Sequence, residues 1–181
     1  MLGLLGVLDL PTHGVIRVRG VDVSRLSDAE RSRLRGEAIG FVFQQFHLIP
    51  HLTALGNVET ALLYRGLSSK RRRGRALEAL EQVDLGDRHD HRPVQLSGGE
   101  QQRVAIARAI ATEPDVVLAD EPTGALDSRN AENVLQIFDD LQTPERSICI
   151  VTHDLHVAHF ARRKISMLDG RIVSDASLER S

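Results

Sequence analysis

The stretch that decides the fold reads Val116-Val117-Leu118-Ala119-Asp120-Glu121-Pro122. Its four apolar residues form a continuous run, which is typical of a strand buried on both faces in a parallel sheet. Two carboxylates follow directly, and in such sheets ligands bind beyond the carboxyl ends of the strands. A strand-end carboxylate of this kind can hold Mg²⁺ beside a nucleotide phosphate. For Asp120 and Glu121 taken alone, a strand that merely ends in solvent is an equally good interpretation. Pro122 disfavours the helical region at Glu121, so we expect extended backbone there.

Two further apolar runs also end in polar side chains. The first run, residues 39–43, is followed directly by Gln44. The second run, residues 148–151, is followed by Thr152 and then His153. If both runs are parallel strands, the Gln44 amide can reach a phosphate or a metal-bound water, and the His153 ring can donate to a phosphate oxygen. Taken singly, each side chain is more commonly a plain strand terminus or loop residue.

The rest of the pattern is mainly helical. Residues 52–112 show no strand-like run, and we expect helices at 57–64, 69–83 and 97–111. Two more are expected at 130–141 and 155–162, and Ser27-Asp28-Ala29-Glu30 has the capping pattern of another helix start. Strands that alternate with helices predict an α/β fold with a parallel sheet. We expect one domain over residues 1–181, with an α/β core from 1–44 and 113–181 and a helical subdomain from 45–112.

The two ends of the chain carry weaker signals. Residues 1–8 have the apolar pattern of a buried helix end, and residues 15–18 alternate like a strand. Asp169-Gly170 lies between two apolar runs and predicts a hairpin turn. Residues 175–181 are polar, and we expect them to fray.

The helix start Ser97-Gly98-Gly99-Glu100 is unusual. Serine followed three residues later by glutamate is a capping box. Two glycines in a first turn cost about 1 kcal/mol each relative to alanine, which a helix selected for stability alone would avoid. They are explained if an anion approaches the free backbone N–H groups, where the helix dipole also favours negative charge. An ordinary capped helix with a flexible entry is the alternative.

Composition excludes several classes of protein. The 181 residues contain 23 Lys and Arg against 25 Asp and Glu, a formal charge of −2, so we expect no nucleic-acid partner. One cysteine, Cys149, excludes an internal disulfide and a cysteine zinc cluster, and favours a reducing compartment. No run approaches the roughly 20 apolar residues that span a bilayer, so a membrane role requires a partner. The basic run at 70–73 is interpreted as a solvated helix start.

Together these stretches resemble the ATP-binding subunits of ABC transporters. Residues 96–103 resemble the signature motif, 116–122 the Walker B strand with the catalytic glutamate, and 125–127 the D-loop. Residues 41–44 resemble the Q-loop and 151–154 the switch-histidine loop. The order of the motifs also matches. Residues 46–50, 62–66 and 91–93 are most similar to the branch that serves lipoprotein release and macrolide export.

The resemblance implies a P-loop NTPase-like core and a role for each motif. Asp120 and Gln44 would contact Mg²⁺, Glu121 would polarise the attacking water, and His153 would contact the γ-phosphate of ATP. Ser97, Gly98, Gly99, Glu100 and Asp127 would line the nucleotide in a dimer, where the signature serves the ATP of the opposite subunit. The resemblance also implies ATP hydrolysis that powers transport, a homo- or heterodimer, and a membrane subunit that holds the chain on the cytoplasmic, inner face of the plasma membrane.

One family motif is missing. The sequence contains no G-x-x-x-x-G-K-[ST] loop, and its two lysines, Lys70 and Lys164, lie in the wrong context to serve one. The opening residues resemble the stretch that follows this Walker A loop in relatives. We expect an N-terminally incomplete ATP-binding domain, inactive as it stands, with an open sheet edge beside Val117. The alternative is a non-hydrolysing partner or regulatory module that supplies only its signature motif.

Overall fold

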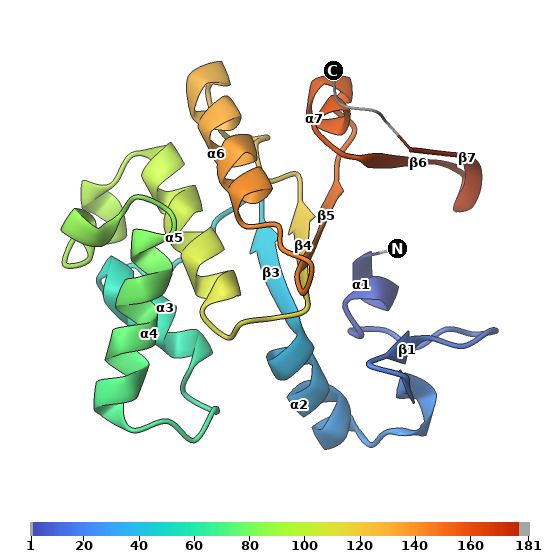
Figure 1. Cartoon of the computed structure of the whole chain (residues 1–181), viewed down its shortest axis with the longest axis horizontal. Helices are drawn as coiled ribbons and strands as arrows, with labels where there is room; N and C mark the ends of the chain where they lie inside the picture. The colour runs from blue at the N-terminus through green and yellow to red at the C-terminus, as the bar shows by residue number, and fades with distance from the viewer. Residues whose placement is uncertain (1, 178–181) are drawn as a thin grey trace.

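The centre of the molecule is a three-stranded parallel sheet (Figure 1). The computed structural model describes residues 2–177. Strands β3 (Ile39–Phe43), β4 (Val116–Asp120) and β5 (Ser147–Val151) lie in the order β3-β4-β5. Phe43 pairs with Asp120, and Asp120 pairs with Val151, so the three strands end at one edge. The expected α/β fold with a parallel sheet is confirmed.

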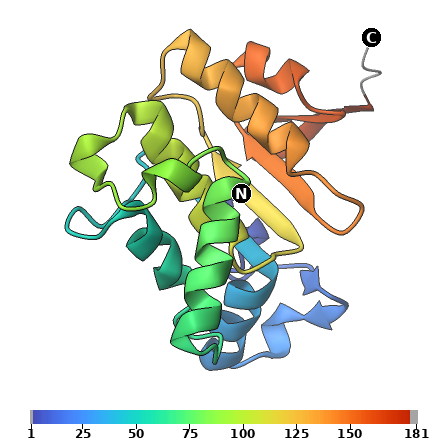
Figure 2. The same ribbon diagram turned by 60° about the vertical axis from the view of Figure 1, so that its left-hand side comes forward.

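Helices flank the sheet on both sides. The helices α3 (Ala54–Ala61), α4 (Ser69–Glu81) and α5 (Gly98–Ile110) form a group to one side, as Figures 1 and 2 show. The others are α1 (Leu2–Leu5), α2 (Asp28–Ala38), α6 (Ser128–Asp140) and α7 (Leu155–His159). Short 3₁₀ turns are η1 (Val23–Arg25), η2 (Gly86–Arg88) and η3 (Pro93–Gln95), and two antiparallel pairs are β1 (Arg17–Val18) with β2 (Val21–Asp22) and β6 (Arg163–Leu168) with β7 (Arg171–Ser177).

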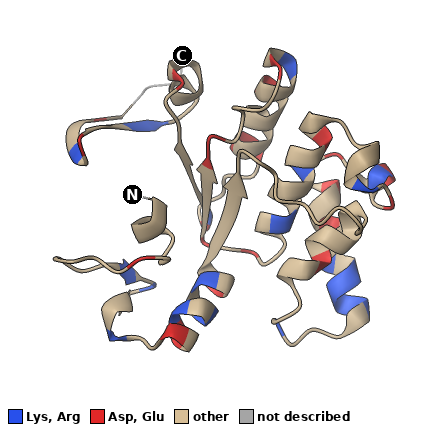
Figure 3. Cartoon of the chain, turned by 180° about the vertical axis from the view of Figure 1, so that it is seen from behind, with Lys and Arg blue, Asp and Glu red and all other residues tan. Residues whose placement is uncertain are grey.

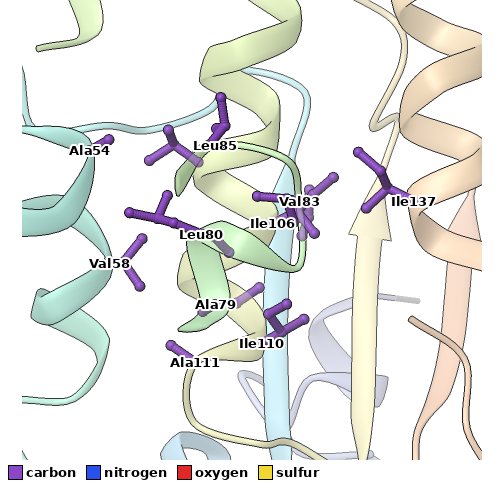
Figure 4. Close-up of a cluster of buried hydrophobic side chains, with 14 of the residues drawn as sticks. Ala54, Val58, Ala79, Leu80, Val83, Leu85, Ile106, Ile110, Ala111 and Ile137 are labelled. Carbon is purple, nitrogen blue, oxygen red and sulfur yellow. The ribbon is translucent and has the colours of Figure 1, made fainter. Parts of the chain in front are cut away.

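One large apolar cluster joins the helical group to the sheet. Val58, Leu80 and Ile106 come from three different helices and are fully buried in this cluster (Figure 4). Val117 and Ala119 of β4 belong to the same cluster, whereas Leu118 points to a second cluster on the other face. Successive residues of β4 are therefore buried on opposite faces of the sheet, which explains why every position of the strand from 116 to 119 is apolar.

The sheet edge differs from the expectation. Val117 is fully buried because β4 lies between β3 and β5. In the order β3-β4-β5 the two outer strands, β3 and β5, are each paired on one side only. Gly40 of β3 packs against Ala109 of α5, whereas residues 148–151 of β5 are all partly exposed. The sheet edges therefore lie beside β3 and β5, and the expectation of an edge beside Val117 is wrong.

Several helix boundaries follow from capping. The Ser27–Glu30 capping box begins α2 as predicted. The third helix begins at Ala54 rather than Asn57, because the Thr53 hydroxyl accepts from Gly56 N over 3.1 Å. The predicted hairpin at Asp169-Gly170 is confirmed, with φ of 49° and 75° at the two turn residues. Strand β7 extends to Ser177, and the remaining residues of the expected frayed tail, 178–181, lie outside the described residues.

The basic run and most of the chain start lie on the surface. Helix α1 has no buried residue, and Leu8 is 58% exposed, so the expectation of a buried helix end is wrong. Val7, which follows α1, is buried in the second apolar cluster, and Leu2 packs against that cluster. The basic run at the start of α4 is coloured blue in Figure 3. There Arg72 forms an ion pair with Glu59, and Lys70, Arg71 and Arg73 are exposed. No helix in residues 2–177 combines the length and apolarity needed to cross a bilayer.

The packing of β3 against α5 generates a stability prediction. A Cβ atom at Gly40 would lie 2.4 Å from the carbonyl oxygen of Ala109, a backbone atom that cannot turn aside. We expect Gly40→Ala to lower the free energy of unfolding by about 1–3 kcal/mol. Gly36→Ala is the matched control, because its Cβ would meet nothing within 4 Å and α2 should gain up to about 1 kcal/mol. Urea denaturation of both variants measures this, and equal stability of the two would contradict the packing account.

Candidate functional site

The Glu121 carboxylate is held by residues that follow β5. The Thr152 hydroxyl donates to Glu121 Oε2 over 2.9 Å, and the backbone N–H of His153 donates to Oε1 over 2.8 Å. The His153 ring nitrogen Nδ1 lies 2.7 Å from the same Oε1. The structure thus brings Glu121 and His153 together, because β4 and β5 end side by side.

These contacts fix the charge of Glu121. Partial burial raises the pKa of the carboxyl, but the hydrogen bonds from His153 and Thr152 outweigh it and hold the pKa below its ordinary value. Glu121 is therefore a carboxylate at neutral pH. Its side chain is 22% exposed, whereas that of His153 is 92% exposed. The ring can leave the carboxylate without disturbing a core.

The backbone at Glu121 is not extended. Its φ is +44°, in the left-handed region, so the extended conformation expected from Pro122 is wrong. A following proline normally pushes a residue to extended backbone, so the contacts of this turn override that preference. The left-handed conformation costs about 1–3 kcal/mol and persists only where its surroundings impose it. Here Glu121 N donates to Val151 O over 2.9 Å, and Gly124 N donates to Glu121 O over 3.1 Å.

Asp120 and Gln44 lie at neighbouring strand ends. Asp120 pairs with Phe43, the residue before Gln44. The Gln44 amide lies over the turn after Glu121, because a Cβ at Gly124 would be 2.8 Å from Gln44 Nε2. Within residues 2–177 no group of three or more His, Cys, Asp or Glu side chains could hold a metal alone. One carboxylate and one amide oxygen fit Mg²⁺, which is commonly held by one or two carboxylates together with phosphate oxygens and water.

The start of α5 is a fully formed capping box. Ser97 N donates to Glu100 Oε2 over 2.8 Å, and Glu100 N donates to Ser97 Oγ over 3.2 Å. The bond from the Ser97 backbone is the main cause that lowers the pKa of Glu100, although burial opposes it. No hydrogen bond found among the described residues joins this cap to Glu121 or His153. Within residues 2–177, the cap of α5 and the Glu121 group therefore form two distinct sets of hydrogen bonds.

The two glycines of the cap have different reasons. A Cβ at Gly99 would lie 2.4 Å from Asn130 Oδ1, so Gly99 is required for α5 to pack against α6. At Gly98 the nearest atom would be Leu126 Cδ2 at an ordinary 3.6 Å, so packing does not demand glycine. The proposed anion approach remains a reason for Gly98 alone. Asp127 caps α6 and accepts from Asn130 N and Nδ2 over 2.9 and 2.7 Å.

Sequence reasoning missed two residues that hold this arrangement. The sequence pattern indicates Thr152 only as the residue between a strand and His153, although its hydroxyl donates to the Glu121 carboxylate. Gln102 is fully buried, and its Nε2 donates to Pro122 O over 2.6 Å. The available signal was a polar side chain among the apolar positions of α5, where Val104, Ala105, Ile106 and Ala109 are all buried.

Comparisons with known proteins show the family of this chain. A model of the family described as ABC transporter matches residues 1–124. The chain is 52% identical over 175 residues to the macrolide export ATP-binding/permease protein MacB 1/2 of Paracoccus denitrificans, covering 97% of this chain and 26% of that protein. It is 46% identical to the uncharacterized ABC transporter ATP-binding protein YvrO of Bacillus subtilis, covering 97% of this chain and 76% of the relative.

Solved structures give the same result. The dimeric post-hydrolysis structure of the ATP-binding cassette MJ0796, bound to ADP and Pi, matches with a TM-score of 0.85 and 45% identity. The match covers 99% of this chain and 80% of that one. The chain spans about a quarter of the length of the MacB relatives that it matches. Relatives named for macrolide export confirm the expected branch. This chain belongs to the ABC transporter family.

Proposed function

We propose that this chain is the ATP-binding and ATP-hydrolysing part of an ABC transporter and powers transport through a membrane subunit. The observation that carries the proposal is the carboxylate of Glu121, ionised and held by Thr152 and His153 at the shared end of β4 and β5. An ionised carboxylate fixed at a strand end is suited to accept a proton from an attacking water.

The roles of the site residues follow from their positions. Asp120 and Gln44 would hold Mg²⁺, which supplies neutralisation of charge on the phosphate oxygens. Glu121 would orient a water after one of its hydrogen bonds to Thr152 or His153 is broken. The exposed ring of His153 is the donor that can move, and it would then face the γ-phosphate. The Thr152 hydroxyl would keep the carboxylate in place during that exchange.

The start of α5 would serve a second subunit. Ser97, Gly98, Gly99 and Glu100 present a capped helix N-terminus, which favours a phosphate group. These residues share no hydrogen bond with Glu121 or His153 among the described residues, and a head-to-tail dimer would let both groups meet one nucleotide, with Asp127 at the junction. Solved relatives described as dimeric cassettes support a dimer. Whether the second subunit is a copy or a homologue is left open.

A membrane subunit is the expected second partner. The MacB relatives are named ATP-binding/permease proteins, which supports a permease acting with this chain. We propose that residues 45–112 are a helical subdomain which, with the loop after Gln44, docks on that permease, while 1–44 and 113–181 form the nucleotide-binding core. The chain would then lie on the cytoplasmic face of the membrane.

A second candidate function rests on the absent phosphate loop. The 181 residues hold no G-x-x-x-x-G-K-[ST], and the two lysines do not supply a substitute. A chain of this kind can act as a non-hydrolysing partner that offers only its signature motif. The retention of Asp120, Glu121, Gln44 and His153 favours hydrolysis, because these residues act on the nucleotide bound by their own subunit.

The missing loop leads to a binding prediction. We expect the 181-residue chain to bind MgATP only weakly and to show no detectable turnover, because no backbone cradle and no lysine hold the β- and γ-phosphates. Calorimetric titration with MgATP measures this. A fusion in which the Walker A segment of a relative precedes residue 1 is the control and should bind tightly. Tight Mg²⁺-dependent binding by the unfused chain would contradict the prediction.

The separation of the two groups of site residues is tested in the same fusion. Glu121→Gln should leave ATP binding intact, reduce hydrolysis by about 10²–10⁴-fold, and let a closed dimer accumulate. Ser97→Arg places bulk and positive charge at the cap, so each chain should bind ATP but remain monomeric. Size-exclusion chromatography with ATP and Mg²⁺ separates the cases. A monomeric Glu121→Gln protein or a dimeric Ser97→Arg protein would show that the roles are assigned wrongly.

A further inference from the structure

We infer that Gln102 is a positioning residue that ties the first turns of α5 to the turn carrying Glu121. Its side chain is fully buried, and its Nε2 donates to the carbonyl oxygen of Pro122 over 2.6 Å. Pro122 directly follows Glu121, so the bond fixes the peptide next to the carboxylate. The contact joins two motifs that lie 20 residues apart in the chain.

Packing alone does not account for a glutamine at this position. Its Oε1 is buried and has no hydrogen-bond partner among the described residues. A buried acceptor without a partner is unfavourable, and methionine or leucine would fill the same space without it. The gain that offsets this cost is the bond to Pro122, whose carbonyl belongs to a buried residue.

The turn needs support from outside itself. Glu121 has a φ of +44°, and the turn closes on itself through Gly124 N to Glu121 O and Leu126 N to Thr123 O. The Gln102 bond reaches this turn from a different element. Close packing reinforces the same junction, since Gly99 lies directly against Asn130 at the start of α6. A shift of α5 must therefore move the turn or break the bond.

This connection gives the two halves of the proposed site a link inside one chain. The start of α5 would contact the nucleotide of the opposite subunit, whereas Glu121 would act on the nucleotide of its own. Gln102 would therefore couple nucleotide contact at the start of α5 to the position of Glu121. The assignment of the two ends rests on the proposed function, but the bond and its effect on the turn are measured without nucleotide. Failure of hydrolysis and failure of this coupling are therefore distinguishable.

The first measurement is amide hydrogen exchange by NMR on the 181-residue chain. The side-chain Nε2 protons of Gln102 should exchange far more slowly than those of exposed Gln45. Gln102→Met should raise exchange at Gly124 and Leu126 by about fivefold, the factor that corresponds to one typical hydrogen bond, without changing exchange in β4. Gln101→Met is the matched control, because Gln101 Nε2 donates to Leu96 O over 3.1 Å and not to the turn.

The second measurement reads the coupling itself. Ser97→Ala weakens the cap of α5 and should raise exchange at Gly124 in the Gln102 protein, but add little in the Gln102→Met background. If Ser97→Ala and Gln102→Met each raise the exchange rate at Gly124 by the same factor alone and in combination, the inference is overturned. Fast exchange of the wild-type Gln102 side chain, which requires no variant to fold, or an equal effect of Gln101→Met would also overturn it.

Discussion

The parallel register of three short strands is the constraint on which the rest of the structure depends. Phe43, Asp120 and Val151 stand in one row, so the residue after each strand emerges at the same edge. Gln44, Glu121 and Thr152 are those residues. Parallel strands that pair in register end at the same edge of the sheet, so the pairing alone places these three residues close together. The apolar clusters on the two faces hold this register by burying alternate residues of β4.

Hydrogen bonding then converts a shared edge into a chemical site. The donors from Thr152 and His153 orient the Glu121 carboxylate and favour its charged form. The left-handed backbone at Glu121 directs the carboxylate toward β5, and Gln102 supports the peptide that follows. A conformation that is unfavourable in isolation is thus stabilised by contacts from β5 and α5, which is common where a side chain must be held for function.

The sequence predicted the parts of this arrangement that depend on local patterns. The apolar runs at 39–43, 116–119 and 148–151 predicted the strands, and serine with glutamate at 27–30 and 97–100 predicted two capping boxes. It could not predict the order β3-β4-β5, in which the sheet edges lie beside β3 and β5 and not beside Val117. The φ of Glu121 and the partners of Thr152 and Gln102 depend on long-range contacts, so the polar side chain of Gln102 among apolar positions of α5 indicated an unusual residue but not its bond to Pro122. The structure also separates Gly99, which packing requires, from Gly98, which it does not.

We propose that these strand ends act on the phosphates of ATP once a phosphate-binding loop is supplied, because the 181 residues contain no G-x-x-x-x-G-K-[ST]. The most direct test is steady-state ATP turnover by the fusion that supplies a Walker A segment before residue 1, compared with the same fusion in which the loop lysine is alanine. We expect saturable, Mg²⁺-dependent turnover in the first protein and its loss in the second. A folded fusion that binds ATP tightly but does not hydrolyse it would contradict the account.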